Sequence, residues 1–187
     1  MTSLAIDTAT NRACVAVVRD GEVLAERAQL APRSQTEDLI PLIDDTLRAA
    51  GVDRREITEV VVGVGPGPFT GLRVGIVTGV MLAKGLGIPV HGVQSLDACA
   101  GVIVAEGSMQ DEFNVAIDAK RGEVFWARYS ADGVRIAGPA VGKDVDAVPG
   151  VMSAAALAMC VERVPPRPLY LREPDATIPG APKKVTP

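Results

Sequence analysis

Histidine and cysteine are scarce in this 187-residue chain, and their scarcity excludes several kinds of site. His91 is the only histidine, so a zinc or iron centre built from several imidazoles is not expected. Cys14, Cys99 and Cys160 are odd in number and form no Cys-x-x-Cys pair. This pattern indicates reduced thiols rather than a disulfide framework or a zinc ribbon. The sequence therefore predicts no metal site and no cofactor.

Aromatic residues and positive charge are also in short supply. Phe, Trp and Tyr make up 3% of the chain, and the formal net charge is −4. Platforms for single-stranded nucleic acid need several rings on one face, and phosphate contacts need a basic surface. We therefore expect that, if RNA is involved, a partner protein holds it.

Long hydrophobic runs and a basic leader are absent as well. The longest uncharged part of the most apolar segment lies between Arg73 and Lys84, which is short of the ~20 residues that cross a bilayer. The chain begins with a strand-like segment, so we expect no signal peptide. Hydrophobic residues reach 48% and charged residues only 22%, as in a folded protein. We expect a cytoplasmic protein without membrane contact.

What the chain does contain is a regular order of apolar segments. Three strands are predicted first, and Asp20-Gly21 is a typical hairpin turn between the second and the third. Helices and strands then alternate, and the first helix begins with a capping box from Ser34 to Glu37. The order predicts an α/β fold with an open mixed sheet and crossover helices. The segments are strands 3–8, 13–19 and 22–30, helix 34–50, strand 59–65, helix 70–84, strand 88–94 and helix 95–106.

The second half restarts the strand order with fewer elements. Strands are predicted over 113–118 and 123–129, with a third after Asp132-Gly133, and a short helix over 153–162. This order suggests a degenerate structural repeat. We predict an N-terminal lobe at 1–106, a second, degenerate lobe at 107–164 and a proline-rich surface tail at 165–187.

The helix predicted over 70–84 has an unusual row of glycines. Gly71, Gly75 and Gly79 recur every four residues on one face, and each costs ~1 kcal/mol relative to alanine in a helix. Close packing of this face against a neighbour can offset the cost. The other faces are apolar nearly all round, which is typical of a helix buried on every side. A partner subunit is therefore a natural cover for this helix.

Two polar turns could form a cleft for an anion. Asp7, Thr8 and Thr10 follow the first strand, and the loop before the 70–84 helix contributes Gly65, Gly67 and Thr70. An acid after a strand could hold a metal–phosphate complex, and a glycine-rich loop before a helix could cradle phosphate. The loop is neither a Walker loop nor a dinucleotide fingerprint. A purely structural turn and a vestigial nucleotide or anion cleft both remain open.

One further arrangement could carry chemistry. A hydrolytic Ser–His–Asp arrangement of His91 with Ser95 and Asp97 is conceivable. The serine lacks a nucleophile elbow, so a structural histidine in a strand is the favoured interpretation.

Several phrases together resemble the TsaB (YeaZ) family. They are residues 4–10, 37–43, 65–75 (GPGPFTGLRVG), 118–129 (DAKRGEVFWARY) and 168–176 (PLYLREPDA). The resemblance implies an actin-like (ASKHA, ribonuclease H-like) two-lobed fold. Family members have a longer stretch before the last helix, where this chain has only Ala140 to Met152, so the C-terminal lobe is expected to be abbreviated.

The resemblance also implies a function. The family supplies a non-catalytic scaffold subunit to the machinery that puts threonylcarbamoyladenosine into tRNA. Such a subunit binds the catalytic subunit TsaD, is joined by the ATPase TsaE, forms a homodimer in isolation and meets tRNA only through the complex. TsaD carries a His-x-x-x-His element on its first helix, which this chain lacks. An actin-like ATPase or kinase-like enzyme and a peptidase-like protein are the alternatives.

By this analogy the helices at 34–50 and 70–85 pack against the same helices of TsaD or of a second copy. The residues expected at the partner interface are Leu39, Ile40, Ile43, Leu47, Leu72, Val77, Val80 and Met81.

Overall fold

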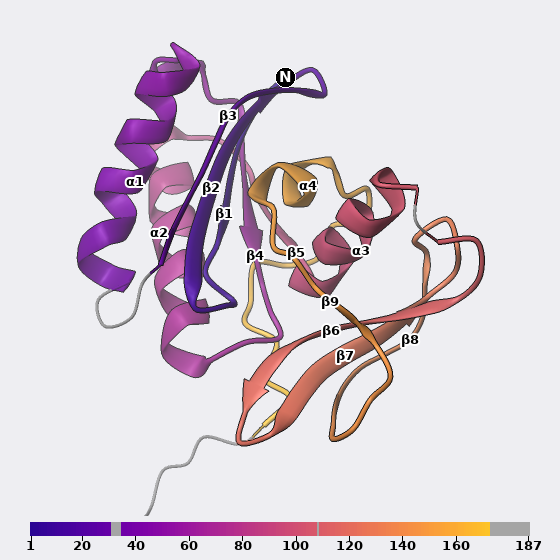
Figure 1. Ribbon diagram of the computed structural model, residues 1–187. Helices are drawn as coiled ribbons and strands as arrows, with labels where there is room; N and C mark the ends of the chain where they lie inside the picture. The colour runs from indigo at the N-terminus through magenta and orange to yellow at the C-terminus, as the bar shows by residue number, and fades with distance from the viewer. Residues whose placement is uncertain (31–34, 108, 173–187) are drawn as a thin grey trace, which may run out of the picture.

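The computed structural model describes residues 1–30, 35–107 and 109–172. The first sheet has the strand order β3-β2-β1-β4-β5 (Figure 1). β1 pairs antiparallel with β2 and parallel with β4, as a mixed sheet with crossovers requires. The three opening strands and the mixed sheet are thus confirmed. The strands are β1 (Thr2–Asp7), β2 (Arg12–Arg19), β3 (Glu22–Leu30), β4 (Glu59–Gly63) and β5 (Val90–Val93).

Helices cover both faces of this sheet. α1 (Gln35–Ala50) and α2 (Phe69–Leu86) lie on one face, and α3 (Ser95–Ala105) and α4 (Ala154–Met159) on the other (Figure 1). A 3-10 turn, η1 (Arg54–Glu56), follows α1. α2 ends at Gly87, whose φ of 69° is the left-handed conformation that glycine adopts readily. The predicted Ser34–Glu37 capping box falls outside the described residues and side chains.

The second sheet repeats the strand order of the first. Its order is β8-β7-β6-β9, in which β6 pairs antiparallel with β7 and parallel with β9. This matches β3-β2-β1-β4, so the predicted repeat of strand order is confirmed. α3 lies between the sheets, and its Leu96 and Cys99 join the core around Tyr129. The strands are β6 (Phe113–Lys120), β7 (Glu123–Tyr129), β8 (Arg135–Gly142) and β9 (Val148–Pro149).

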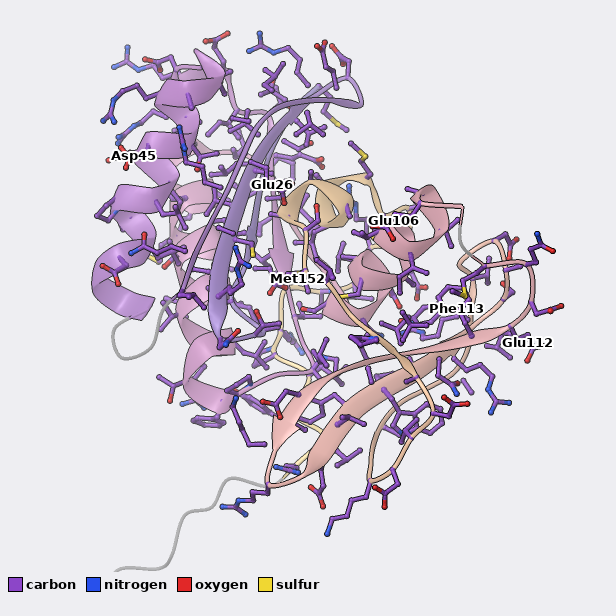
Figure 2. The ribbon with its side chains drawn as sticks, viewed as in Figure 1. Glu26, Asp45, Glu106, Glu112, Phe113 and Met152 are labelled. Atoms are coloured by element: carbon purple, nitrogen blue, oxygen red, sulfur yellow. The ribbon has the colours of Figure 1, made fainter. Side chains whose placement is uncertain are left out.

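α4 belongs by its packing to the first sheet. Leu157 and the alanines of α4 pack in one cluster with Ala5 and Ala16. The Glu26 carboxylate of β3 accepts hydrogen bonds from the backbone N–H groups of Ala154 (2.6 Å) and Ala155 (3.2 Å). Figure 2 shows Glu26 beside the start of α4. The boundaries at 106/107 and 164/165 remain predictions, but the helix within 107–164 covers the first sheet.

Residues 164–172, the C-terminal strap, contact both sheets. Val164 and Gly92 form an isolated antiparallel bridge, and the Leu169 N–H donates to the Val64 carbonyl oxygen (2.8 Å). At the far end Nη1 of Arg172 donates to the Ala119 carbonyl oxygen (2.8 Å). Residues 165–172 of the predicted surface tail are exposed or half-buried, and their backbone and side chains bond to the folded body. Residues 173–187 lie outside the described part.

Candidate functional site

The glycine face of α2 packs directly on the first sheet. A Cβ on Gly75 would lie well inside 3.0 Å of Thr8 Oγ1, and one on Gly79 well inside 3.0 Å of Val62 Cγ1. Real Cβ atoms essentially never come that close. The interpretation that the glycine row permits close approach is confirmed at these two positions.

The outward side of α2 remains uncovered in this chain. Val77 is 59% exposed and Met81 60% exposed, one turn apart. On neighbouring α1, Ile40 is 48% exposed. This agrees with the expectation that the chain alone does not cover α2 on every side, because the sheet covers only one of its faces. Ile40, Val77 and Met81 are called the α1–α2 face below.

Four of the predicted interface residues lie in the core instead. Leu39, Ile43, Leu47 and Leu72 are all buried in the cluster between α1, α2 and the first sheet. This corrects their assignment to a partner surface, because the chain itself already covers them. Val80 is half-buried and packs against the same cluster. Val77, Met81 and Ile40 are the predicted residues whose side chains are exposed.

α2 is also long and apolar enough to cross a membrane by length and composition alone. Among the helices of the described residues, α2 has the length and the mean hydropathy, 1.3, that would allow it to cross a bilayer. Core helices pass the same test, and the glycine face of α2 packs on β1 and β4 as a core helix does.

Asp7 lies at the end of β1 and is completely buried. Oδ2 accepts a hydrogen bond from Ser95 Oγ (2.6 Å), and Oδ1 accepts one from the Ala9 N–H (2.7 Å). Burial raises the pKa of Asp7, while these two hydrogen bonds lower it. The Asp7 carboxylate has no exposed surface, which favours the structural turn over a site for a metal–phosphate complex.

Of the other residues predicted for the cleft, some pack beside Asp7 and the others lie away from it. Thr8 Oγ1 donates to the Gly71 carbonyl oxygen (2.7 Å), and the Gly65 N–H donates to Ser95 Oγ (3.2 Å). A Cβ on Gly67 would collide with the Ala9 backbone. Thr10 lines a cavity of about 510 Å³, and Thr70 is exposed at the first turn of α2. The structure thus brings Asp7, Thr8, Gly65 and Gly67 together as a closed joint rather than an open cleft.

The conceivable triad does not assemble. Ser95 Oγ donates to Asp7, and the Asp97 carboxylate accepts from the Tyr129 hydroxyl (2.8 Å). Nε2 of His91 lies 3.9 Å from the buried Glu59 carboxylate. The structural interpretation of His91 agrees with this geometry. Among the residues that the structure describes, no group of three His, Cys, Asp or Glu side chains could hold a metal ion.

A pocket that the sequence did not predict lies between the start of α2, the β6–β7 turn and the C-terminal strap. Its volume is about 250 Å³, and its walls come from three distant segments, 67–69, 119–121 and 170–172, together with Phe125. The C-terminal strap forms one wall: the Tyr170 ring stacks on Phe69 with centroids 4.8 Å apart. Sequence spacing alone could not reveal this pocket, because its walls are about 50 to 100 residues apart in the chain.

Comparisons with known proteins point in one direction. Residues 28–176 match the family model described as "TsaD: tRNA N6-adenosine threonylcarbamoyltransferase". The chain is 39% identical to the tRNA threonylcarbamoyladenosine biosynthesis protein TsaB of Escherichia coli, over 71% of this chain and 56% of that protein. It is 40% identical to protein Rv3421c of Mycobacterium tuberculosis, over 94% of this chain and 93% of that protein.

Length differs among these relatives. The chain spans about half the length of the TsaB relatives it matches and of protein ML0378 of Mycobacterium leprae (55–59% of each).

Solved structures agree on the fold. A Pseudomonas aeruginosa protein "with similarity to peptidase YEAZ" superimposes with a TM-score of 0.78 at 25% identity, over 91% of this chain and 99% of that one. Component A of (R)-2-hydroxyglutaryl-CoA dehydratase from Acidaminococcus fermentans reaches a TM-score of 0.50 at 14% identity, over 77% of this chain and 48% of that one. This second likeness concerns the fold alone. The α/β fold with mixed sheets is of the actin-like type.

Proposed function

The chain belongs to the TsaB (YeaZ) family, and on this premise we propose that it acts in forming threonylcarbamoyladenosine in tRNA as a subunit without chemistry of its own. In this proposal it works in the cytosol and binds the catalytic subunit TsaD through the α1–α2 face. The ATPase TsaE joins the assembly, and tRNA is reached only through it. Without TsaD the same face binds a second copy of the chain.

The observation that carries this proposal is the uncovered outer side of α2. Val77 and Met81 are more than half exposed, although the opposite face of the helix is fixed to the sheet by its glycines. Burying a Val or Met side chain completely contributes ~1.5–3 kcal/mol. Packing these side chains against a partner helix is therefore more favourable in free energy than leaving them exposed to water.

Two observations support the absence of catalysis. The family model that matches is named for the transferase, yet the chain has one histidine and therefore no His-x-x-x-His element. The acid expected at a phosphate site, Asp7, is buried and hydrogen-bonded to Ser95 and Ala9. An actin-like ATPase would need this carboxylate to face solvent and metal.

The proposal is tested with purified TsaD from the same organism. Calorimetry should detect binding of the chain, and Val77→Glu should abolish it, because the carboxylate would be buried without a partner. Val134→Glu is the matched control: Val134 is 62% exposed, on the turn before β8, and its replacement should leave binding unchanged. If wild type and Val77→Glu bind TsaD equally well, the chain does not bind TsaD through the α1–α2 face.

The ATPase alternative has its own test. ATP turnover by the isolated chain, lost in Asp7→Ala, would favour an enzyme. We expect no turnover above the buffer rate in either protein, because Asp7 is completely buried.

A further inference from the structure

A gap separates the start of α2 from the β6–β7 turn. Two cavities, of about 250 and 510 Å³, are both lined by Pro68, just before α2, and by Lys120, at the end of β6. Elsewhere α3 joins the two sheets: its Ala98 packs in the first-sheet cluster, and its Asp97 carboxylate accepts from the Tyr129 hydroxyl of β7 (2.8 Å). The C-terminal strap crosses the gap, so it bears on how the sheets lie relative to each other at this end.

The strap begins with an anchor and a stiff span. Val164 and Gly92 exchange two backbone hydrogen bonds (2.8 and 2.9 Å), which adds Val164 to the edge of the first sheet at β5. Three of the next four residues are prolines, whose rings fix φ and remove the backbone N–H donor. The Leu169 N–H then donates to the Val64 carbonyl oxygen (2.8 Å). This stiff span carries residues 169–172, called the latch below, to the gap.

The latch holds the start of α2 through Tyr170. The Tyr170 ring stacks on Phe69 with centroids 4.8 Å apart, and Arg73 Nε donates to the Tyr170 hydroxyl (2.9 Å). The Arg73 guanidinium lies 3.9 Å from the Phe69 centroid, so the three side chains form one stack. Arg73 is one turn before Val77, and the latch therefore contacts the same helix that carries the α1–α2 face.

The latch holds the second sheet through its last two residues. Arg172 Nη1 donates to the Ala119 carbonyl oxygen of β6 (2.8 Å), and Arg172 forms an ion pair with Glu123 at the start of β7. Leu171 packs against the core cluster around Tyr129. All four latch residues are only half-buried. Their contacts can therefore open locally without exposing the core of either sheet.

We propose that residues 169–172 are a releasable latch that fixes the second sheet relative to α2. When the latch detaches, the second sheet turns about α3 while both sheets keep their cores. When it is closed, it sets the orientation of the second sheet to the α1–α2 face, because Tyr170 and Arg172 hold the two sides of the gap from adjacent parts of one stiff segment. This device acts within the chain and needs no partner protein.

The test measures residual dipolar couplings of the backbone amides in the aligned 15N-labelled chain, because these report the relative orientation of rigid parts. In wild type, the amides of both sheets should fit a single alignment tensor. The double variant Tyr170→Ala/Arg172→Ala removes both holds of the latch. Each sheet should then still fit a tensor of its own, but the two tensors should differ. Hydrogen exchange of the Leu169 amide should become about tenfold faster or more.

Arg167→Ala is the matched control, since Arg167 lies in the same strap and is exposed. It should behave like wild type in both measurements. Two different tensors in the double variant and one in the control would support the latch. The proposal is overturned if the double variant keeps a single tensor, or if the control has the same effect. It is also overturned if either sheet of the double variant no longer fits its own tensor, because the segment would then be part of the core.

Discussion

The Thr8 hydroxyl donates a hydrogen bond to the Gly71 carbonyl oxygen across 2.7 Å and joins the end of β1 to the first turns of α2. One turn later the bare α-carbon of Gly75 faces the same hydroxyl. The helix therefore lies as close to the sheet as backbone atoms allow. Because this inner face is fixed, Val77 and Met81 are held on the outside.

Gly75→Ala tests this close approach. The new Cβ would lie inside 3.0 Å of Thr8 Oγ1, so we expect the free energy of unfolding to fall by about 1–3 kcal/mol. Gly85→Ala is the matched control in the same helix, since a Cβ there meets nothing within 4 Å. It should stabilise by up to about 1 kcal/mol. Urea unfolding measures both, and an unchanged Gly75→Ala protein would disprove the contact.

Asp7→Asn tests the closed joint through its pH dependence. Burial raises the pKa of Asp7 above 3.8. The folded chain therefore binds this proton more tightly than the unfolded chain, and the resulting stability is present below the unfolded pKa and lost as pH rises through the folded pKa. The free energy of unfolding of wild type, minus that of Asp7→Asn, should decrease as pH rises above 3.8.

Other carboxyl groups do not contribute to this difference between wild type and Asp7→Asn. Hydrogen bonds lower the pKa values of Asp20, Asp118 and Asp132, which gives an opposite slope, but these groups are common to both proteins and cancel. A difference that stays constant from acid to neutral pH would show that Asp7 titrates normally.

The purified chain should bind no stoichiometric transition metal and hydrolyse no peptide. The sequence holds one histidine, and burial raises the pKa of Cys14 to about 12 and that of Cys160 to about 11. Thiols that stay protonated are poor ligands and poor nucleophiles. Elemental analysis that finds one zinc or iron per chain would contradict this expectation.

In the absence of a partner the chain should self-associate through the α1–α2 face. Sedimentation velocity at rising protein concentration should show a dimer, and Val77→Glu should return the chain to a monomer because two carboxylates would meet at the symmetric contact. A wild-type chain that remains monomeric at tens of micromolar would count against this use of the face.

Local sequence patterns predicted the order of strands and helices and the close packing of the glycine row. The β-branched apolar runs at 3–8 and 13–19 are typical of buried strands, and the structure has β1 and β2 there, both largely buried. Spacing by four placed Gly75 and Gly79 against the sheet. The apolar positions could not be divided into core and surface, because Leu72 and Val77 look alike in sequence and only the packed sheet distinguishes them.

Local sequence patterns could not predict contacts between segments that are distant in the chain. The sequence left open whether Asp7 belongs to a structural turn or to an anion cleft, and its hydrogen bond from Ser95, 88 residues away, could not be predicted. α4 packs on the first sheet because the Glu26 carboxylate of β3 accepts from its first N–H groups. Proline-rich composition predicted a surface tail, but it could not show that Tyr170 of this segment stacks on Phe69. Each outcome depends on tertiary packing that overrides local preference.

The central claim is that the outer side of α2 binds TsaD, and Met81→Glu tests it most directly. Met81 is 60% exposed, so the thermal midpoint of the isolated chain should hardly change. An unpaired carboxylate buried at the interface should weaken the affinity for TsaD by about 100-fold or more. Met159→Glu, 47% exposed at the end of α4, should bind normally.

The measurement is the dissociation constant for TsaD of these two variants, taken beside their melting curves. If the outer side of α2 binds TsaD, Met81→Glu melts like wild type and does not bind, and tRNA from a strain relying on it lacks threonylcarbamoyladenosine. A Met81→Glu chain that folds and binds TsaD like wild type would place the interface elsewhere. A chain that unfolds would make α2 an ordinary core helix.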